Sequence, residues 1–562
     1  MRDKINAFIS TGNRAGLLLG LAVSGLLTGA FETFPSFPGM LLQWIALVPA
    51  CLALYALADR AHAGEESGGG VGGGGGGGDA KPKKRRPLRR FFSLYGYGFV
   101  FFMSEYIVIY HWFLSMYPLE VTGMSRGYAL AVVLLGWIGL SVLGSLGGAL
   151  IFAAAVMSLS FCRRRLQLLM PFAAASAYPL FEWFETQFWT GVPWNRLGLS
   201  QFAGNFTATL MTSSFFGPYF TSFLIVLVSA LTAYAIRYGR AGICLPLASG
   251  LFAANLAAGL LLIAFSPSAG SVTAAALQGN YSSTEKWNDS ARLGAVDKYA
   301  EMTYSAADAG AGIIVWPETA VTYNVTDGSG TDIYLSSVAR NSGSVVAAGC
   351  FEPGSHGSRN VLRIYLPDGT HVTSYVKRHL VPFGEYIPHR AFFERAVPPL
   401  TEIAMLENDL EPGSGTYVFD SGDMTVGCLI CFDSIYEDLA RESGADGAQI
   451  LLLSTNDSWF AESKALYMHE AQSRLRAIEN GVPVVRSANT GISSVTDRFG
   501  RVIGESEPSV EATVTAGVEL PAHRTLYSYL GNSVLAVMLA VCVFPPLYSL
   551  AAYAKARLQK KK

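Results

Sequence analysis

Charged side chains are scarce in this chain of 562 residues. Asp, Glu, Lys and Arg make up only 15% of it, whereas soluble proteins carry about 25%. Hydrophobic residues make up 51% and aromatic residues 12%. The shortage of charge excludes a wholly soluble protein and indicates a membrane protein with a soluble portion.

Cysteines are also few, and the seven of them form an odd set without regular spacing, which excludes a disulfide framework. Cys428 and Cys431 form a C-x-x-C pair, but a redox pair normally opens a helix. Residues 424–431 are instead typical of a strand, in which residues three apart point to opposite faces. No second ligand pair follows at a spacing suitable for zinc. We therefore expect neither a redox pair nor a metal site.

Lysine and arginine are not spread evenly along the sequence. The formal net charge is −1, and the basic residues concentrate in short segments between apolar runs, where membrane topology places them. This distribution argues against nucleic acid as a partner. Ionisable residues inside the apolar runs are few, and the chain shows no internal repeat, so transport is a disfavoured function.

Long apolar runs dominate the first half of the chain. A membrane span needs about 20 residues, and eight runs qualify: 15–31, 40–58, 91–113, 128–161, 166–188, 216–236, 242–265 and 527–553. These runs predict a transmembrane domain at 1–266 with seven spans, a domain outside the membrane at 267–522, and a final span with a basic tail at 523–562.

The basic segments predict the orientation. The basic segments are residues 2–14, 81–90, 163–165, 237–240 and 555–562. All five fall on one side of the membrane if every apolar run crosses it once. Both termini are then cytoplasmic. The cytoplasmic loop 59–90 contains a glycine-rich flexible linker at 68–78. Its basic part either binds anionic lipid headgroups or serves as a stop-transfer anchor.

The region between the last two spans is predicted to be a layered α/β domain. Apolar runs typical of strands recur at 272–278, 312–316, 344–348, 361–365, 424–431, 450–454, 482–487 and 494–497. Helical periodicity appears between them at 289–309, 434–443 and 465–480. Strands that alternate with helices are typical of layered α/β domains.

Two of these strands end in chemically useful residues. Residues 313–318 end at Glu318, residues 424–431 end at Cys431, and Lys377 lies between them in the sequence. A carboxylate can act as a general base, an ammonium group can stabilise an oxyanion, and a thiol can carry an acyl group. The three together predict a cysteine nucleophile site.

The order Glu, Lys, Cys on strand ends resembles the nitrilase superfamily. Further motifs resemble one of its families, the apolipoprotein N-acyltransferases: Leu277 to Asn280 (Leu-Gln-Gly-Asn), Lys286-Trp287, Trp316 to Thr319, His379 to Pro388, Asn456 to Phe460, Arg476 to Glu479, Arg486 to Ile492 and, in the membrane half, Gly191 to Trp194. The resemblance covers nearly the whole chain apart from 68–78. It implies an α-β-β-α sandwich attached to a multi-span membrane domain.

The resemblance also assigns roles. It implies that Cys431 is the nucleophile, that Glu318 is the base, and that Lys377 and the backbone N–H of Phe432 hold the oxyanion. Glu385 matches a second glutamate of the family, which orients Lys377 or assists proton transfer. No metal or organic cofactor is implied.

Further residues are expected to support the site or contact substrate. The resemblance implies that Trp287 packs against the acyl chain or the acceptor and that Asn360 is a polar substrate position. Asn456 either lines the site or supports its loop. Phe432-Asp433 stands where many members have Tyr-Glu, so a site role and a structural role both remain open.

The implied function is acyl transfer by way of a thioester. Family members take an acyl chain from a membrane phospholipid and pass it to the N-terminal amine of an S-diacylglyceryl-cysteine in an apolipoprotein. The implied location is the bacterial inner membrane, with the catalytic domain periplasmic. Two alternatives are a membrane-tethered amidase or nitrilase acting on small C–N substrates, and a catalytically inactive lipoprotein-binding scaffold.

One apolar segment follows the lysine motif. It contains Phe392, Phe393, Val397, Leu400, Ile403 and Met405. The segment is either a lid that touches the bilayer or an ordinary arm packed on the domain.

Overall fold

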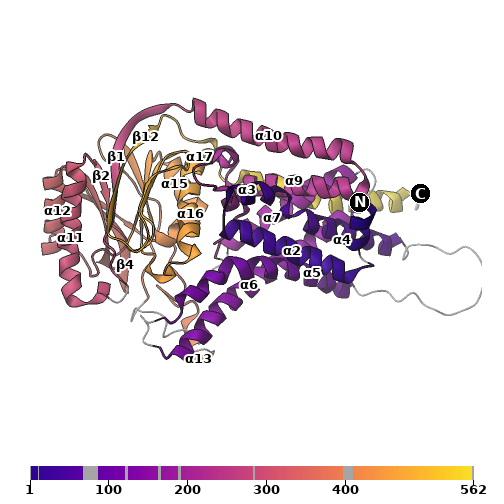
Figure 1. The fold of residues 1–562 in the computed structure, drawn as a ribbon, viewed down its shortest axis with the longest axis horizontal. Helices are drawn as coiled ribbons and strands as arrows, with labels where there is room; N and C mark the ends of the chain where they lie inside the picture. Colours follow the sequence, from indigo (N-terminus) through magenta and orange to yellow (C-terminus); the bar gives the residue numbers. More distant parts are fainter. Residues whose placement is uncertain are drawn as a thin grey trace, which may run out of the picture.

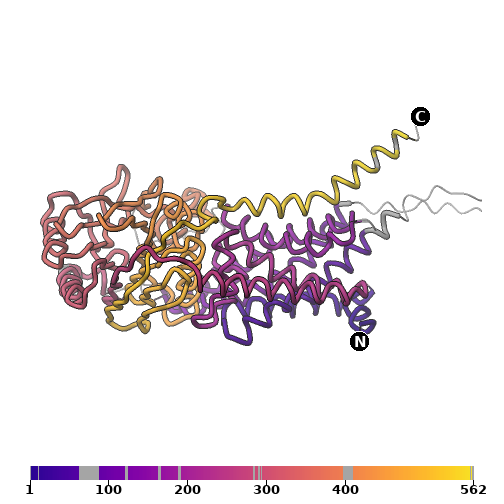
Figure 2. Tube along the Cα trace, turned by 90° about the horizontal axis from the view of Figure 1, so that it is seen from above, coloured from indigo at the N-terminus to yellow at the C-terminus, as the bar shows by residue number. Residues whose placement is uncertain are grey.

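The protein is described here by a computed structural model, which covers residues 2–10, 12–66, 87–119, 124–162, 166–187, 192–282, 285–396 and 409–559. It has two parts, an elongated helical bundle and an α/β domain at one end of it (Figure 1). Helix α1 (Arg2–Phe8) and the end of α18 (Ser533–Gln559) lie at the other end of the bundle (Figure 2). The glycine-rich linker 68–78, the basic segments 81–86 and 163–165, and residues 397–408 of the expected lid lie outside the described residues.

The bundle contains most of the long helices. Its further elements are α2 (Arg14–Thr33), α3 (Phe37–Ala46), α4 (Val48–Glu66), α5 (Pro87–Ile109), η1 (Tyr110–Met116), α6 (Arg126–Ser160), η3 (Gln167–Leu169), α7 (Met170–Thr186), η4 (Leu197–Gln201), η5 (Ala208–Leu210), α8 (Ser213–Phe216), α9 (Pro218–Tyr238), α10 (Ala241–Phe265) and α17 (Leu526–Leu530). Helix α9 is largely buried, whereas α10 and α18 expose most of their apolar surface. An apolar helix surface facing outward is what lipid contact requires.

Seven helices in the described part of the chain are long and apolar enough to cross a membrane. This number differs from the eight predicted spans because residues 166–188 form α7, which has 17 residues and contains Pro179. A span needs about 20 residues, so α7 alone falls short, but η3 directly precedes it and the two together run from Gln167 to Thr186. The other seven predicted spans all correspond to long helices, so the multi-span helical membrane part of the predicted fold class is confirmed.

The α/β domain contains two six-stranded sheets. The first has the order β12 (Ala512–Pro521), β1 (Ser268–Gln278), β2 (Ile313–Val315), β3 (Val345–Pro353), β4 (Ser358–Tyr365), β5 (His371–Val376). The second has the order β11 (Val502–Glu505), β10 (Ser494–Thr496), β9 (Val484–Ala488), β8 (Ile450–Thr455), β7 (Thr425–Ile430), β6 (Val418–Asp420). The central strands of each sheet are parallel and the outer pairs antiparallel.

Helices cover both outer faces of the paired sheets. Helices α11 (Asp289–Asp308) and α12 (Gly330–Ser342) cover the first sheet, and α15 (Glu437–Ala445) and α16 (Lys464–Asn480) lie between the second sheet and the bundle (Figure 1). One core cluster joins the facing sides of the two sheets, with Val315 and Ile430 among its members. The predicted α-β-β-α sandwich is therefore confirmed.

A buried ion pair joins the two parts of the protein. Arg196, just before η4 in the bundle, donates to Glu437 at the start of α15 over 2.6 Å, and both side chains are at most 3% exposed. Tyr219 in α9 donates to the other oxygen of Glu437 at 2.5 Å, and Asn532 donates to it at 3.1 Å. One carboxylate thus collects donors from three segments, and it fixes the α/β domain on the bundle.

We expect Glu437→Ala to lower the free energy of unfolding by about 3–5 kcal/mol, because the change leaves the charge of Arg196 buried and uncompensated. The apparent melting temperature of the purified protein in detergent measures this effect. The matched control is Glu442→Ala, which removes the partly exposed pair of Arg378 with Glu442 and should cost at most about 1 kcal/mol. Equal losses in the two variants would contradict the role of the buried pair.

Candidate active site

Glu318 lies just past the end of β2. The strand is fully buried, and Trp316 and Pro317 carry the chain to Glu318, which is 5% exposed. Thr319 follows with a φ of 50°, a left-handed conformation that a β-branched residue rarely adopts. The carboxylate oxygen Oε1 accepts hydrogen bonds from Lys377 Nζ at 2.8 Å and from Asn360 Nδ2 at 2.7 Å. The tight turn after β2 thus presents this carboxylate to the ends of β4 and β5.

Lys377 follows β5 and is 1% exposed. Its ammonium group lies between two carboxylates, at 2.8 Å from Glu318 and 2.9 Å from Glu385. Burial lowers the pKa of Lys377, but the charges of Glu318 and Glu385 raise it further, so the net pKa lies well above the usual value. Lys377 is therefore a permanent cation in this site.

Cys431 occupies the junction of β7 and η7 (Cys431–Ile435). Its φ is 49°, so the chain turns sharply at the residue that carries the thiol. Burial and the charge of Glu318 raise the pKa of the Cys431 thiol, and Lys377 opposes this shift. The thiol is therefore protonated at neutral pH, and attack on a carbonyl group requires a base that takes its proton.

Glu385 is held on the other side of the lysine. Its side chain accepts from Lys377, from Asn360 Nδ2 at 3.1 Å and from the backbone N–H of Val381 at 2.9 Å. Burial raises the pKa of Glu385, and the charge of Lys377 partly reverses that effect. The structure thus brings Glu318, Lys377 and Glu385 into one network, next to the thiol whose pKa Glu318 and Lys377 influence.

Asp433 supports the turn that carries Cys431. It is fully buried and accepts from the backbone N–H groups of His379 at 2.8 Å and Ile430 at 3.2 Å, and from the Tyr375 hydroxyl at 2.9 Å. Burial raises the pKa of Asp433 to about 6. These contacts tie the segment after Lys377 to the end of β7, which is a structural contribution.

The expected substrate residues lie around the same network. Asn360 in β4 is 2% exposed and donates to both carboxylates. Trp287 closes η6 (Glu285–Trp287), is 39% exposed and packs at a tilt against Phe351. Asn456 accepts from Asn489 Nδ2 at 3.2 Å, which links two loops at the ends of β8 and β9. Substrate contact by these residues stays a prediction.

Lys286 is a site residue that the sequence reasoning did not single out. Its side chain is 5% exposed, and its Nζ donates to the backbone carbonyl of Glu318 at 2.7 Å. Burial lowers the pKa of Lys286 to about 8, against the opposing charge of Glu318. The Lys286 side chain thus holds the turn after β2 through the backbone of Glu318. Its only signal in the sequence was its place beside Trp287.

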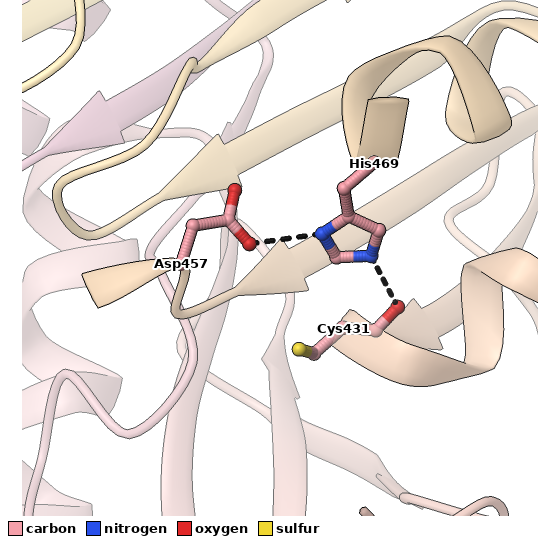
Figure 3. Close-up of side chains that lie close together, drawn as sticks. All are labelled: Cys431, Asp457 and His469. Atoms are coloured by element: carbon pink, nitrogen blue, oxygen red, sulfur yellow. Dashed lines mark hydrogen bonds and ion pairs between the residues drawn. The ribbon is translucent and has the colours of Figure 1, made fainter. Parts of the chain in front are cut away.

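His469 in α16 is a second such residue. One ring nitrogen lies 2.9 Å from Asp457 Oδ1, and the other lies 3.3 Å from the backbone carbonyl of Cys431 and 3.0 Å from Ser434 Oγ (Figure 3). A lone histidine in a helix gives no sign of such a contact. Asp457 also pairs with the buried Arg486.

Two groups of described residues have ligand atoms close enough to hold a metal ion: Cys431, Asp457 and His469, and Asp327, Asp332 and His371. In each group an arginine already pairs with an acidic member, Arg486 in the first and Arg363 in the second. A fixed guanidinium group repels a cation at such short range. The donor sets therefore do not favour a metal.

An aromatic cluster connects the site to the bundle. Phe460 of η8 (Ser458–Phe460) contacts the rings of Trp112 in η1 and Trp194 before η4 at centroid distances of 5.1 and 5.3 Å. Trp194 also stacks on His469 at 5.8 Å. The apolar interior of the bundle thus reaches the residues that surround Cys431.

Two family models match the chain. The model described as carbon-nitrogen hydrolase matches residues 273–526, and the model described as apolipoprotein N-acyltransferase N-terminal domain matches residues 82–231. Among solved structures, an amidase from Nesterenkonia sp. is 19% identical with a TM-score of 0.36, covering 48% of this chain and 97% of that chain.

Curated relatives match more than half of the chain. The apolipoprotein N-acyltransferase of Geobacter metallireducens is 31% identical over 355 residues, which are 61% of this chain and 67% of the relative. That of Brucella melitensis is 30% identical over 369 residues, 63% of this chain and 67% of the relative. The chain therefore belongs to the apolipoprotein N-acyltransferase family of the nitrilase superfamily.

Proposed function

We propose that this protein transfers an acyl chain from a membrane phospholipid to the N-terminal amine of a diacylglyceryl-modified apolipoprotein, with Cys431 carrying the chain as a thioester. The observation that carries the proposal is the Glu318–Lys377–Glu385 network beside the partly buried thiol of Cys431. A membrane half whose aromatic cluster reaches this site supports a lipid as the acyl donor.

The first half-reaction loads the cysteine. Glu318 accepts the thiol proton as Sγ attacks the ester carbonyl, and the carbonyl electron pair moves onto oxygen. Lys377 and the Phe432 N–H stabilise that oxyanion. When the tetrahedral intermediate collapses, the C–O bond breaks, Glu318 returns the proton to the leaving oxygen, and a lysophospholipid departs.

The second half-reaction transfers the acyl chain from Cys431 to the acceptor amine. A neutral amine attacks the thioester carbonyl, Glu318 accepts a proton from the amine, and the C–S bond breaks as Glu318 passes that proton to the sulfur and restores the thiol. The amine competes with water only if the thioester is shielded. The burial of Glu318 and Lys377 supports such shielding.

We also propose that the α/β domain faces the periplasm from the inner membrane of a bacterium, with both termini in the cytoplasm. The basic segments support this orientation. The position of α1 and the end of α18 at the bundle end far from the α/β domain is consistent with it (Figure 2).

Incubation with a defined phospholipid and no acceptor should add the mass of one acyl chain to the purified protein. Intact-mass spectrometry measures the adduct, which hydroxylamine should remove because thioesters are labile to it. Cys431→Ala should show no adduct. The matched control is Cys428→Ala, three residues earlier and buried in β7, which should retain the adduct. Absence of an adduct from folded wild-type protein with several headgroups would contradict the proposal and favour an amidase or a scaffold.

Glu318→Gln should make the Cys431 thiol easier to deprotonate and should slow acyl loading. Loss of the Glu318 charge, and the release of Lys377 toward the thiol, should move the pH dependence of Cys431 alkylation by iodoacetamide to lower pH. Acyl loading should nevertheless slow by about 10²–10⁴-fold, because the base is gone. Both rates are followed by mass, with Glu442→Gln as the control. Loading at the wild-type rate would rule out Glu318 as the base.

The orientation can be tested by labelling one introduced cysteine at a time in a background in which all seven native cysteines are replaced by alanine. Asp423→Cys, on an exposed turn of the α/β domain, should react with a membrane-impermeant maleimide in intact spheroplasts. Lys4→Cys, exposed in α1, should react only after the membrane is permeabilised. The reverse pattern would contradict the proposed orientation.

A further inference from the structure

The backbone of Cys431 is held in an unusual conformation. A φ of 49° is costly for a residue other than glycine, by about 1–3 kcal/mol, and persists only where the surroundings fix it. In this turn the carbonyl oxygen of Cys431 accepts from Ser434 Oγ at 2.7 Å and lies 3.3 Å from His469 Nε2. The carbonyl group is therefore fixed from two sides.

The same contacts fix the N–H group of the next residue. The carbonyl of Cys431 and the N–H of Phe432 belong to one planar, trans peptide unit, in which the two groups point in opposite directions. Phe432 is the second residue of η7, and the first N–H groups of a helix have no acceptor inside it. Hydrogen bonds to the Cys431 oxygen thus aim the Phe432 N–H away from His469, as a free donor.

His469 is held against that carbonyl. Its Nδ1 lies 2.9 Å from Asp457 Oδ1 and 3.3 Å from Arg486 Nη2. Ser434 has one hydroxyl hydrogen, which the 2.7 Å bond directs to the Cys431 oxygen. Toward His469 Nε2, at 3.0 Å, Ser434 then presents a lone pair. Nε2 thus faces both the Cys431 carbonyl oxygen and Ser434 Oγ, and it is the ring atom that contacts this peptide unit.

The ring cannot move freely. His469 is 1% exposed, and Asp457 is held by Thr455 Oγ1 at 3.0 Å and by Arg486. The Trp194 ring from the membrane half covers one face of the imidazole, and Gln472 in α16 donates to the Trp194 carbonyl at 3.0 Å. The orientation of His469 therefore depends on both halves of the protein.

We propose that His469, oriented by Asp457 and Trp194, is a positioning residue that aims the Phe432 N–H at the oxyanion of the acyl-transfer reaction. The inference rests on the proposed function in taking Cys431 as the nucleophile. It goes beyond that function because it gives the membrane-facing layer of the domain a role in stabilising the oxyanion.

The test compares two variants with equal polarity and different reach. The amide nitrogen of glutamine corresponds in position to imidazole Nε2, and that of asparagine to Nδ1. His469→Asn should therefore slow acylation of Cys431 on the order of 100-fold, whereas His469→Gln should stay within about fivefold of wild type. The acyl donor is p-nitrophenyl octanoate, which loses p-nitrophenolate as the C–S bond forms, so that the rate constant and the half-saturating concentration are both measured.

A second reaction separates oxyanion stabilisation from damage to the thiol. Iodoacetamide alkylates Cys431 by displacement of iodide, with no tetrahedral oxyanion. Alkylation by both variants should therefore stay within about threefold of wild type, with the half-saturating ester concentration also unchanged. His523→Asn, at an exposed residue away from the site, is the control. Equal acylation by His469→Asn and wild type, equal losses in the Asn and Gln variants, or alkylation that falls as far as acylation would overturn the inference.

Ser434→Ala keeps the proposal testable if His469→Asn does not fold. It removes the other donor to the Cys431 carbonyl and should slow acylation by about tenfold without slowing alkylation. Unchanged acylation would overturn the inference. Because the ester needs no phospholipid site, wild-type protein that reacts with the ester and not with phospholipid would contradict the proposed function alone. Wild-type protein that reacts with neither would overturn both.

Discussion

The buried ammonium group of Lys377 is the constraint on which the catalytic half depends. Removing a charge from water costs several kcal/mol, and only close partners offset that cost. Glu318 comes from the end of β2, Glu385 from the segment after β5, and Asn360 from β4. Both carboxylates lie within 2.9 Å of Lys377 Nζ, and Asn360 Nδ2 lies within 3.1 Å of both carboxylates. The edge of the first sheet must therefore keep its register for the lysine to remain buried. That same register sets the charge environment of Cys431, which comes from the second sheet.

The central strands of both sheets could be predicted from the sequence, and the edge strands could not. All eight predicted strands exist, and those missed, β5, β6, β11 and β12, are the four edges of the two sheets. Central parallel strands are buried on both faces and appear as continuous apolar runs, as in β8 (Ile450–Thr455). An edge strand such as β12 alternates between buried and exposed residues, and its pairing with β1 is a long-range contact that no local pattern records.

The same distinction applies to the site. Glu318 and Cys431 end central strands, so their neighbourhood followed from sequence. Lys286 and His469 contact the backbone carbonyl groups of Glu318 and Cys431. Every residue has such a carbonyl group, so the sequence does not indicate which one a side chain contacts. The predicted span 166–188 runs two residues past the end of α7 for a related reason. Hydropathy registers composition, whereas the end of α7 and the turn before η4 are set by polar contacts, such as the hydrogen bond from the Leu197 N–H to Glu182 at 2.9 Å.

The two halves share more than a covalent link. Arg196 and Trp194 lie two residues apart in the bundle, and one pairs with Glu437 at the start of α15 while the other stacks on His469 in α16. Both target helices form the layer that covers the second sheet, and η7 with Cys431 connects β7 of that sheet to α15. A displacement of the domain on the bundle would therefore reach the peptide unit of Cys431 through α16. The seating of the α/β domain on the bundle and the geometry of the Cys431 peptide unit thus depend on one interface.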